Sequence, residues 1–458
     1  MQSENKLGTM PISKLIWNMS LPIIASMLVQ ALYNIVDSVF VSRASEQALT
    51  AVSLAFPAQN LMIGLATGTA VGVNALMGRA LGAGMRERAD RVANNGVFLA
   101  VVGFLISAVL GLTCADLFFR SQTQVENIIR MGNDYLRIVT IGSLGMFCQV
   151  MYERLLQGTG RSMLSMYTQS LGAIINIALD PVFIFVLGMG IRGAAVATVL
   201  SQLLSAAFVV YFLRCKSEYR VQPLPLRQLP ANRRCIGDIV SLGTAGFIMQ
   251  LTNSVVTICC NNVLSVTGGD VYISVMTIIS SMRQMVETPI YAITEGSSPI
   301  ISYNYGARRP RKVLRAAVSM ALMALVYTLT TWAVILLAPH FLISIFSSDP
   351  TLQADTIPAM KLYFSTFGFM LLQYVGQTVF KSLNKRRHAM FFSLLRKVII
   401  VVPLTYLLPY AFGMGTDGVF AAEPVSNVIG GSLCFIVMLI TVLPELKRMD
   451  REDAKTAK

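Results

Sequence analysis

The sequence has 458 residues, of which 54% are hydrophobic and 13% are charged, whereas soluble domains carry about 25% charged residues. These proportions exclude a disordered, collagen-like or disulfide-rich chain, and they are atypical of a cytosolic enzyme. The net charge of +14, from 37 basic and 23 acidic residues, leaves two classes. One is a basic protein that binds nucleic acid, and the other is a membrane protein with its basic residues on one side.

Twelve segments are long and apolar enough to cross a bilayer, because a helix needs about 20 apolar residues to do so. In chain order they are 15–42, 47–78, 92–115, 134–152, 162–191, 193–213, 239–269, 271–302, 316–339, 362–380, 398–415 and 418–443. The first, fourth, fifth, eighth and twelfth contain embedded charges. The first segment is too long for the hydrophobic part of a signal peptide and leads directly into a second span, so we expect no cleavable signal.

The basic residues lie almost entirely on one side of these predicted spans. With the N-terminus inside, the cytoplasmic segments hold 28 basic residues and the opposite loops hold four, Arg43, Arg120, Arg130 and Arg192, while the other five lie within or at the edge of spans. This asymmetry predicts that both termini are cytoplasmic. No basic segment stands apart from a span, so nucleic-acid binding is excluded. We therefore expect an all-α, multi-pass protein of the inner (plasma) membrane.

The twelve spans divide into two halves that repeat weakly. GMGIRGAAVATVLS at 188–201 pairs with GMGTDGVFAAEPVS at 413–426, at an offset of 225 residues, and Gly82-Ala83 pairs with Gly306-Ala307 at an offset of 224. Each half has an even number of spans, so the repeat is parallel, and such halves usually flank a central cavity. We expect a lobe at 1–214, a cytoplasmic linker at 215–234, a second lobe at 235–443 and a cytoplasmic tail at 444–458.

Carboxylates inside predicted spans indicate a functional site, because charge in a bilayer is costly. Asp37 lies in the first span and Asp180 in the fifth, with Asn176 one helical turn before Asp180. Asp180 and Thr198 are equally far from the hairpin turn near Met189, at a depth of about 13 Å. These four polar residues predict an oxygen-only site for a proton or a small hard cation. The alternative is that Asp180 caps a helix broken by its proline.

The second half does not copy this site. Thr405 and Glu423 stand at the positions that match Asp180 and Thr198, and the eighth span instead carries Arg283, Glu287 and Glu295. Arg283 and Glu287 are four residues apart, so an ion pair within one helix is the simpler interpretation. The alternative is that Glu287 or Glu295 binds a cationic substrate.

The remaining chemistry-bearing residues do not form a catalytic or metal-binding pattern. His340 and His388 are isolated, and no cysteine pair forms a CxxC motif, so we expect no metal and no cofactor. Paired acidic motifs of a membrane enzyme are also absent. An ion channel would need rings of like residues, whereas the acidic site occurs in one half only. Glu153 is a further cavity candidate, although anchoring at the inner membrane surface is the simpler interpretation.

Several motifs together resemble the multidrug and toxic compound extrusion (MATE) family, across essentially the whole chain. They are YNIVDSVFVSR at 33–43, GLATGTAVGVNALMGRALGAG at 64–84, QGTGRSMLSMYTQSLGAIINIALDPVFIF at 157–185, GMGIRGAAVAT at 188–198 and PIISYNYGARRPRK at 299–312. The sequence is most similar to the branch of bacterial DinF-type and MepA-type transporters. This resemblance implies a V-shaped, two-lobed, monomeric transporter that exports organic cations against a proton or sodium gradient.

The resemblance also implies roles for single residues. It assigns ion coupling to Asp37, Asn176, Asp180 and Thr198, and it places Gln30 and Tyr33 at the cavity of the same lobe. Asn34, next to Tyr33, is a further candidate for this cavity. A NorM-type sodium site in the second lobe is not expected, since the seventh span offers only Gln250 and Asn253, and the tenth only Gln373.

Two alternative transport functions remain. One is a flippase for a lipid-linked oligosaccharide precursor, and the other is an exporter of an endogenous metabolite. A polyanionic substrate is disfavoured, because the charges inside the first half are acidic and Arg283 has a carboxylate partner nearby.

Overall fold

The computed structural model describes residues 6–216, 229–346 and 350–456, and this part of the chain is helical with no strand. The elements, in chain order, are α1 (Lys6–Thr9), α2 (Ile12–Ala44), α3 (Glu46–Gly82), α4 (Arg86–Arg120), α5 (Glu126–Ile141), α6 (Leu144–Gly158), α7 (Ser162–Pro181), η1 (Val182–Val186), α8 (Ile191–Lys216), α9 (Leu229–Thr267), α10 (Gly269–Gly306), α11 (Pro310–Leu337), α12 (Pro339–Ser344), α13 (Pro350–Tyr363), α14 (Phe367–Ser382), α15 (Arg386–Leu394), η3 (Leu395–Val401), α16 (Val402–Tyr410), α17 (Gly415–Ser426), η4 (Asn427–Gly431) and α18 (Ser432–Thr456). The elements named η are π-helices that continue an α-helix.

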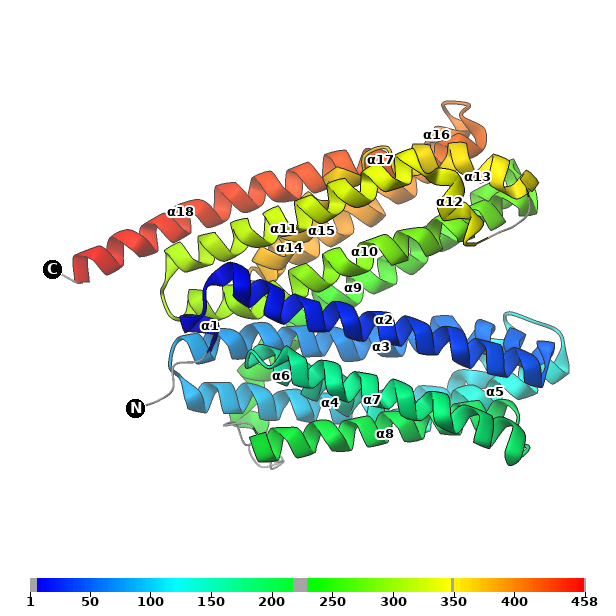
Figure 1. Cartoon of the computed structure of the whole chain (residues 1–458), viewed down its shortest axis with the longest axis horizontal. Helices are drawn as coiled ribbons and strands as arrows, with labels where there is room; N and C mark the ends of the chain where they lie inside the picture. The colour runs from blue at the N-terminus through cyan, green and yellow to red at the C-terminus, as the bar shows by residue number, and fades with distance from the viewer. Residues whose placement is uncertain (1–5, 217–228, 347–349, 457–458) are drawn as a thin grey trace. The chain divides into compact units, whose positions relative to one another are not determined.

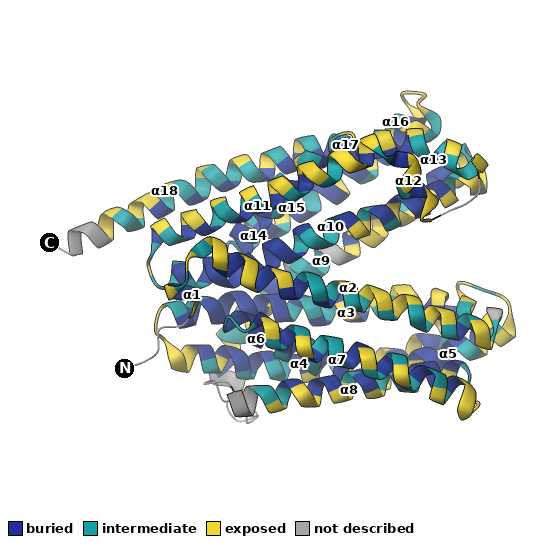
Figure 2. Cartoon of the chain, viewed as in Figure 1, coloured by how far each residue is buried: buried dark blue, intermediate teal, exposed yellow. Residues whose placement is uncertain are grey.

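Nine helical stretches of the described chain are long and apolar enough to cross a membrane. The other three predicted spans correspond to the α5–α6 pair, which breaks at Gly142, to α10 with its embedded charges, and to the α13–α14 pair. Large apolar side chains also remain exposed along single helices, such as Leu314, Val318 and Leu322 on α11 (Figure 2). Apolar surface of this extent is expected where lipid replaces water. The all-α membrane fold predicted from the sequence is confirmed.

The chain forms two compact units. The described part of the first runs from Leu21 to Phe247, and the second contains Lys6–Ser20 and Ile248–Lys458. Within the first unit α3 packs along α4 and α7 along α8, and within the second α10 packs along α11 (Figure 1).

The unit boundary differs from the expected one. It falls inside α9, because this helix already begins at Leu229 and runs without interruption to Thr267. Most of the expected linker, residues 217–228, lies outside the described residues. The expected tail also differs, since α18 continues as a helix to Thr456. Arg311 and Asp450 form an ion pair of 3.1 Å that joins this extension to α11.

The start of the chain packs with the second unit. The carbonyl oxygen of Gly8 at the end of α1 accepts hydrogen bonds from Arg309 (3.3 Å) and Lys312 (2.5 Å). Asn304 donates to the Leu7 carbonyl at 3.2 Å, and Ser20 donates to Ile293 at 3.5 Å. These bonds to α10 and α11 explain why Lys6–Ser20 belongs to the second unit.

The repeated GMG motifs form the same turn in both halves. Gly188 and Gly190 have positive φ angles of 64° and 55°, and Gly413 and Gly415 have φ angles of 67° and 57°. Residues other than glycine rarely adopt this left-handed backbone region. The weak sequence repeat therefore records a backbone requirement at two equivalent helical hairpins, α7–α8 and α16–α17.

Candidate functional site

Asp180 is completely buried at the end of α7 in the first unit. Asn176 lies one turn earlier and donates a hydrogen bond from Nδ2 to Asp180 Oδ1 at 3.3 Å. Pro181 lacks a backbone N–H, and directly after it the helix continues as the π-helix η1. The carboxyl group is thus held at a point where the regular helix ends.

The side chain of Asp37 on α2 lies within hydrogen-bonding reach of the side chain of Asp180. Carboxylates are acceptors only, so two of them can share a hydrogen bond only when a proton lies between them. Three buried oxygens at this point accept no hydrogen bond from any described residue, namely Asp37 Oδ1, Asn176 Oδ1 and Asp180 Oδ2. Such a set of oxygens suits a proton or a small hard cation.

Two tyrosines near this carboxyl pair, Tyr33 on α2 and Tyr135 on α5, are hydrogen-bonded to further polar side chains. Tyr33 and Gln30 on α2 are joined by a side-chain hydrogen bond, and Gln169 on α7 donates to Gln30 Oε1 at 3.0 Å. Tyr135 on α5 lies near both carboxyl groups and accepts a hydrogen bond from Gln59 at 3.1 Å. The sequence reasoning missed Gln59, Tyr135 and Gln169. The sequence could have indicated Gln169, because this residue lies two helical turns before Asn176 on the same helix face.

The described part of the chain shows no hydrogen bond between the carboxyl pair and the other residues predicted for this lobe. Thr198 is half-buried on α8, which packs along α7, but no contact in the described part of the chain joins its hydroxyl to Asp180. Asn34 is exposed on α2. Glu153 is buried on α6 and accepts a hydrogen bond from Gln149 at 3.0 Å.

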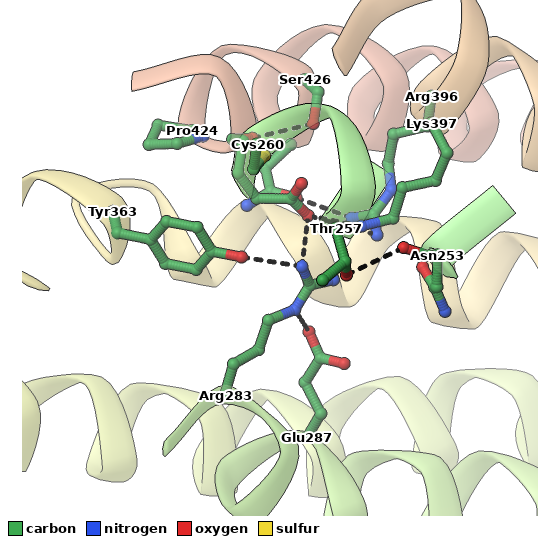
Figure 3. A network of polar contacts seen from close by, with 12 residues as sticks. Asn253, Thr257, Cys260, Arg283, Glu287, Tyr363, Arg396, Lys397, Pro424 and Ser426 are labelled. Carbon is green, nitrogen blue, oxygen red and sulfur yellow. Dashed lines mark hydrogen bonds and ion pairs between the residues drawn. The ribbon is translucent and has the colours of Figure 1, made fainter. Parts of the chain in front are cut away.

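The second unit contains a buried ion-pair network that begins at Arg283 on α10 (Figure 3). The Arg283 guanidinium pairs with Glu287 on the same helix, as the spacing predicts, and its Nη1 lies 3.1 Å from Glu423 Oε1 on α17. Arg283 also donates to the Tyr363 hydroxyl at 2.8 Å, and the Tyr374 hydroxyl donates to Glu287 Oε2 at 3.1 Å. The pair is therefore part of a network across helices, not an isolated pair within one helix.

Two further basic residues complete this network from η3. Lys397 Nζ lies 2.9 Å from Glu423 Oε1, and Arg396 Nη2 lies 3.6 Å from the same oxygen. Arg396 also donates to Asn427 Oδ1 at 2.6 Å. The sequence reasoning missed these basic residues, since it began the eleventh span at residue 398. In the structure this helical stretch runs from Arg386 to Tyr410, with Arg396 and Lys397 buried.

Glu295 stands in a separate ion pair of the second unit. Its Oε1 lies 2.9 Å from Lys381 Nζ on α14, and both residues are buried. Among the described residues, no group of three His, Cys, Asp or Glu side chains could hold a metal ion.

Comparison with known families decides the identity of the fold. The model of the family described as MatE matches this chain twice, over residues 22–182 and 246–407. The chain belongs to the MatE family. The two matches fall in the two halves, in keeping with the offset of 224–225 residues between the repeated motifs.

The relatives of this MatE protein include an FAD transporter and multidrug export proteins. It is 23% identical over 442 residues to a protein from Shewanella oneidensis named FAD transporter, covering 95% of this chain and 96% of the relative. It is 23% identical over 438 residues to the multidrug export protein MepA of Staphylococcus aureus strain N315, covering 94% of each. The MepA-like character predicted from the motifs is confirmed, and the protein is a multi-pass membrane transporter.

Solved structures of the family match over nearly the whole chain. One is described as the outward-facing conformation of a multidrug resistance MATE family transporter of the MOP superfamily. It matches with a TM-score of 0.90 at 25% identity, covering 98% of this chain and 99% of that chain. Another is a MOP superfamily transporter from Pyrococcus furiosus with a TM-score of 0.87 at 25% identity, covering 96% and 98%, whose description reports reverse polarity of the binding pocket.

The two units of this MatE transporter thus carry polar networks of opposite character. In the first unit the charged residues of the site are the carboxyl groups of Asp37 and Asp180. In the second unit Arg283, Arg396 and Lys397 surround Glu423. The two networks therefore offer different chemistry to a bound ion or molecule.

Proposed function

We propose that this MatE transporter is a secondary active exporter that exchanges small organic molecules for protons or sodium ions. It acts in the plasma membrane as a monomer, with both termini in the cytoplasm and by alternating access between its two units. The observation that carries the proposal is the buried meeting of Asp37 with Asp180, beside Asn176.

The carboxyl pair supplies the coupling step. When a proton or a sodium ion occupies it, the site carries one negative charge less than when it is empty. Burial makes the empty, doubly charged state costly, since two carboxylates repel each other strongly where water is excluded. Ion binding therefore changes the relative free energy of conformations that hydrate the site differently, and alternating access requires such a change.

The first candidate substrate class is organic cations. The multidrug export proteins among the relatives and the acidic side chains of the first unit support it. The second candidate is an anionic metabolite. The FAD transporter among the relatives and the basic network around Arg283 favour this class, which the sequence reasoning had disfavoured.

Transport by the full chain in proteoliposomes tests the proposal. Outward proton and sodium gradients are imposed separately, with the membrane potential clamped, and the uptake of ethidium and of flavin mononucleotide is followed. We expect one of the two gradients to drive uptake of at least one dye, and Asp180→Asn to abolish the effect of that gradient. Asp134→Asn is the matched control, because Asp134 is a carboxylate of the same unit that pairs with Arg192 in an exposed position. If neither gradient drives uptake of either dye, the proposed exchange is wrong.

A further inference from the structure

The ion-pair network of the second unit contains more basic than acidic side chains. Among the described residues it contains three basic side chains, Arg283, Arg396 and Lys397, and two carboxylates, Glu287 and Glu423. The charged groups with the largest effects on Lys397 and Glu423 are among these five residues. An unbalanced charge inside a membrane protein is costly and is usually functional.

Three basic side chains converge on a single acceptor atom. Arg283, Lys397 and Arg396 approach Oε1 of Glu423 at 3.1, 2.9 and 3.6 Å. One carboxylate oxygen can satisfy only part of the hydrogen-bonding capacity of three cations, since each of them carries several N–H donors. The network therefore retains donors and positive charge for a further anionic oxygen.

The network has one end that is less buried than the other. The side chains of Arg283 and Glu287 are each 17% exposed, whereas those of Glu423, Arg396 and Lys397 are 5–6% exposed. Arg283 uses Nε for Glu287 and Nη1 for Tyr363 and Glu423, and its Nη2 has no partner in the described part of the chain. A guanidinium with a free terminal nitrogen suits an oxyanion, which it binds through charge-assisted hydrogen bonds.

The backbone beneath the network is also irregular. Arg396 and Lys397 lie in the π-helix η3, and Asn427, which pairs with Arg396, begins the π-helix η4. Short π-helical segments are rare and occur frequently at functional sites. The two basic side chains thus stand at a helix distortion of the kind often found where proteins bind ligands.

We propose that the second unit binds an anionic oxygen group of the transported molecule, such as a phosphate, through Arg283. Arg396 and Lys397 supply the unbalanced positive charge from the more buried end. The inference rests on the proposed export of small organic molecules, and it names one chemical group that the substrate carries.

Equilibrium binding to the detergent-solubilised full chain tests this without any ion gradient. The probes are riboflavin and flavin mononucleotide, which differ by one phosphate group and report binding by their own fluorescence. We expect flavin mononucleotide to bind about tenfold or more tighter than riboflavin, the preference that one charge-assisted hydrogen bond gives. A preference below this, or no binding of either flavin, would overturn the proposal.

Two neighbouring variants separate charge recognition from structural damage. Arg283→Gln removes the free donor, so the preference for flavin mononucleotide should fall to about onefold. Glu287→Gln removes a negative charge at an equally exposed position, so the preference should rise above that of the parent protein. Because damage to the fold would lower both preferences, a shift of both variants in the same direction contradicts the proposal.

A charge-matched control comes from the same unit. Arg311→Gln also removes one positive charge, but from an exposed pair with Asp450, and it should leave the flavin preference unchanged. These experiments distinguish a failure of the proposed anion binding from a failure of the proposed exchange. Loss of gradient-driven uptake with an intact phosphate preference would contradict the proposed exchange, whereas loss of the preference with intact uptake contradicts only the anionic group.

Discussion

Lys397 Nζ lies 2.9 Å from Glu423 Oε1, and this ion pair joins η3 to α17 in the interior of the second unit. The same carboxylate oxygen holds Arg283 and Arg396, so one acidic side chain connects basic groups from two separate helical stretches. Removing this carboxylate affects all three cations at once, whereas removing one cation leaves the other two paired.

Glu423→Gln should therefore destabilise the protein strongly. Breaking a buried ion pair by removing one partner costs about 3–5 kcal/mol, because an uncompensated charge stays buried. Thermal unfolding of the solubilised protein measures this loss. Glu452→Gln serves as the control, because Glu452 pairs with Arg308 and Arg448 at the exposed end of α18 and should contribute little. A Glu423→Gln protein as stable as its parent would show that the network is not a stabilising centre.

Substitutions in the Asp37–Asp180 pair, unlike Glu423→Gln, should leave thermal stability unchanged and abolish transport. Asp37→Asn and Asp180→Asn each place an amide N–H donor opposite the remaining carboxylate, so neither should lower the thermal stability. Each should nevertheless reduce gradient-driven uptake in proteoliposomes to the level of empty vesicles. The double variant should be no worse than either single one, since residues that act as a unit are not additive. Additive partial losses from the two substitutions would mean that the carboxyl groups work independently.

Much of this architecture is predictable because the membrane imposes simple rules on the sequence. Span lengths, the positions of Asp37, Asn176 and Asp180, and the two GMG turns all follow from local patterns. The position of Arg396 and Lys397 does not follow, because charged residues at the edge of an apolar segment are assigned to the loop by any hydropathy argument. Their burial depends on Glu423, which comes from another helix and reaches them only through tertiary packing. The same holds for Tyr135 and Gln59 beside the first-unit carboxyl pair.

Close glycine packing between α3 and α9 gives a prediction for the first unit. Gly68 and Gly72 are spaced four residues apart, and a Cβ at Gly72 would lie 2.5 Å from the carbonyl oxygen of Ile239. Small residues with this spacing let membrane helices approach closely. Gly72→Ala should lower the free energy of unfolding by about 1–3 kcal/mol through overpacking against a backbone atom. Gly237→Ala on α9 is the matched control, because a Cβ there meets open space. Equal unfolding temperatures for the two variants would argue against the tight crossing.

Variants of the Glu295–Lys381 pair test whether Glu295 has a structural role or binds a cationic substrate. Glu295 is 2% exposed and lies 2.9 Å from Lys381 Nζ, so its carboxylate is already neutralised inside the protein. Glu295→Gln should destabilise the protein by about 3–5 kcal/mol, as expected when a buried pair loses one member. The double variant Glu295→Gln with Lys381→Met should recover most of that loss, because it removes both charges together. Its relative uptake of ethidium and flavin mononucleotide should equal that of the parent protein, since the pair is separate from the network around Arg283. A selective loss of ethidium uptake at unchanged stability would instead assign Glu295 to the binding of a cationic substrate, the role that its position in the eighth span first suggested.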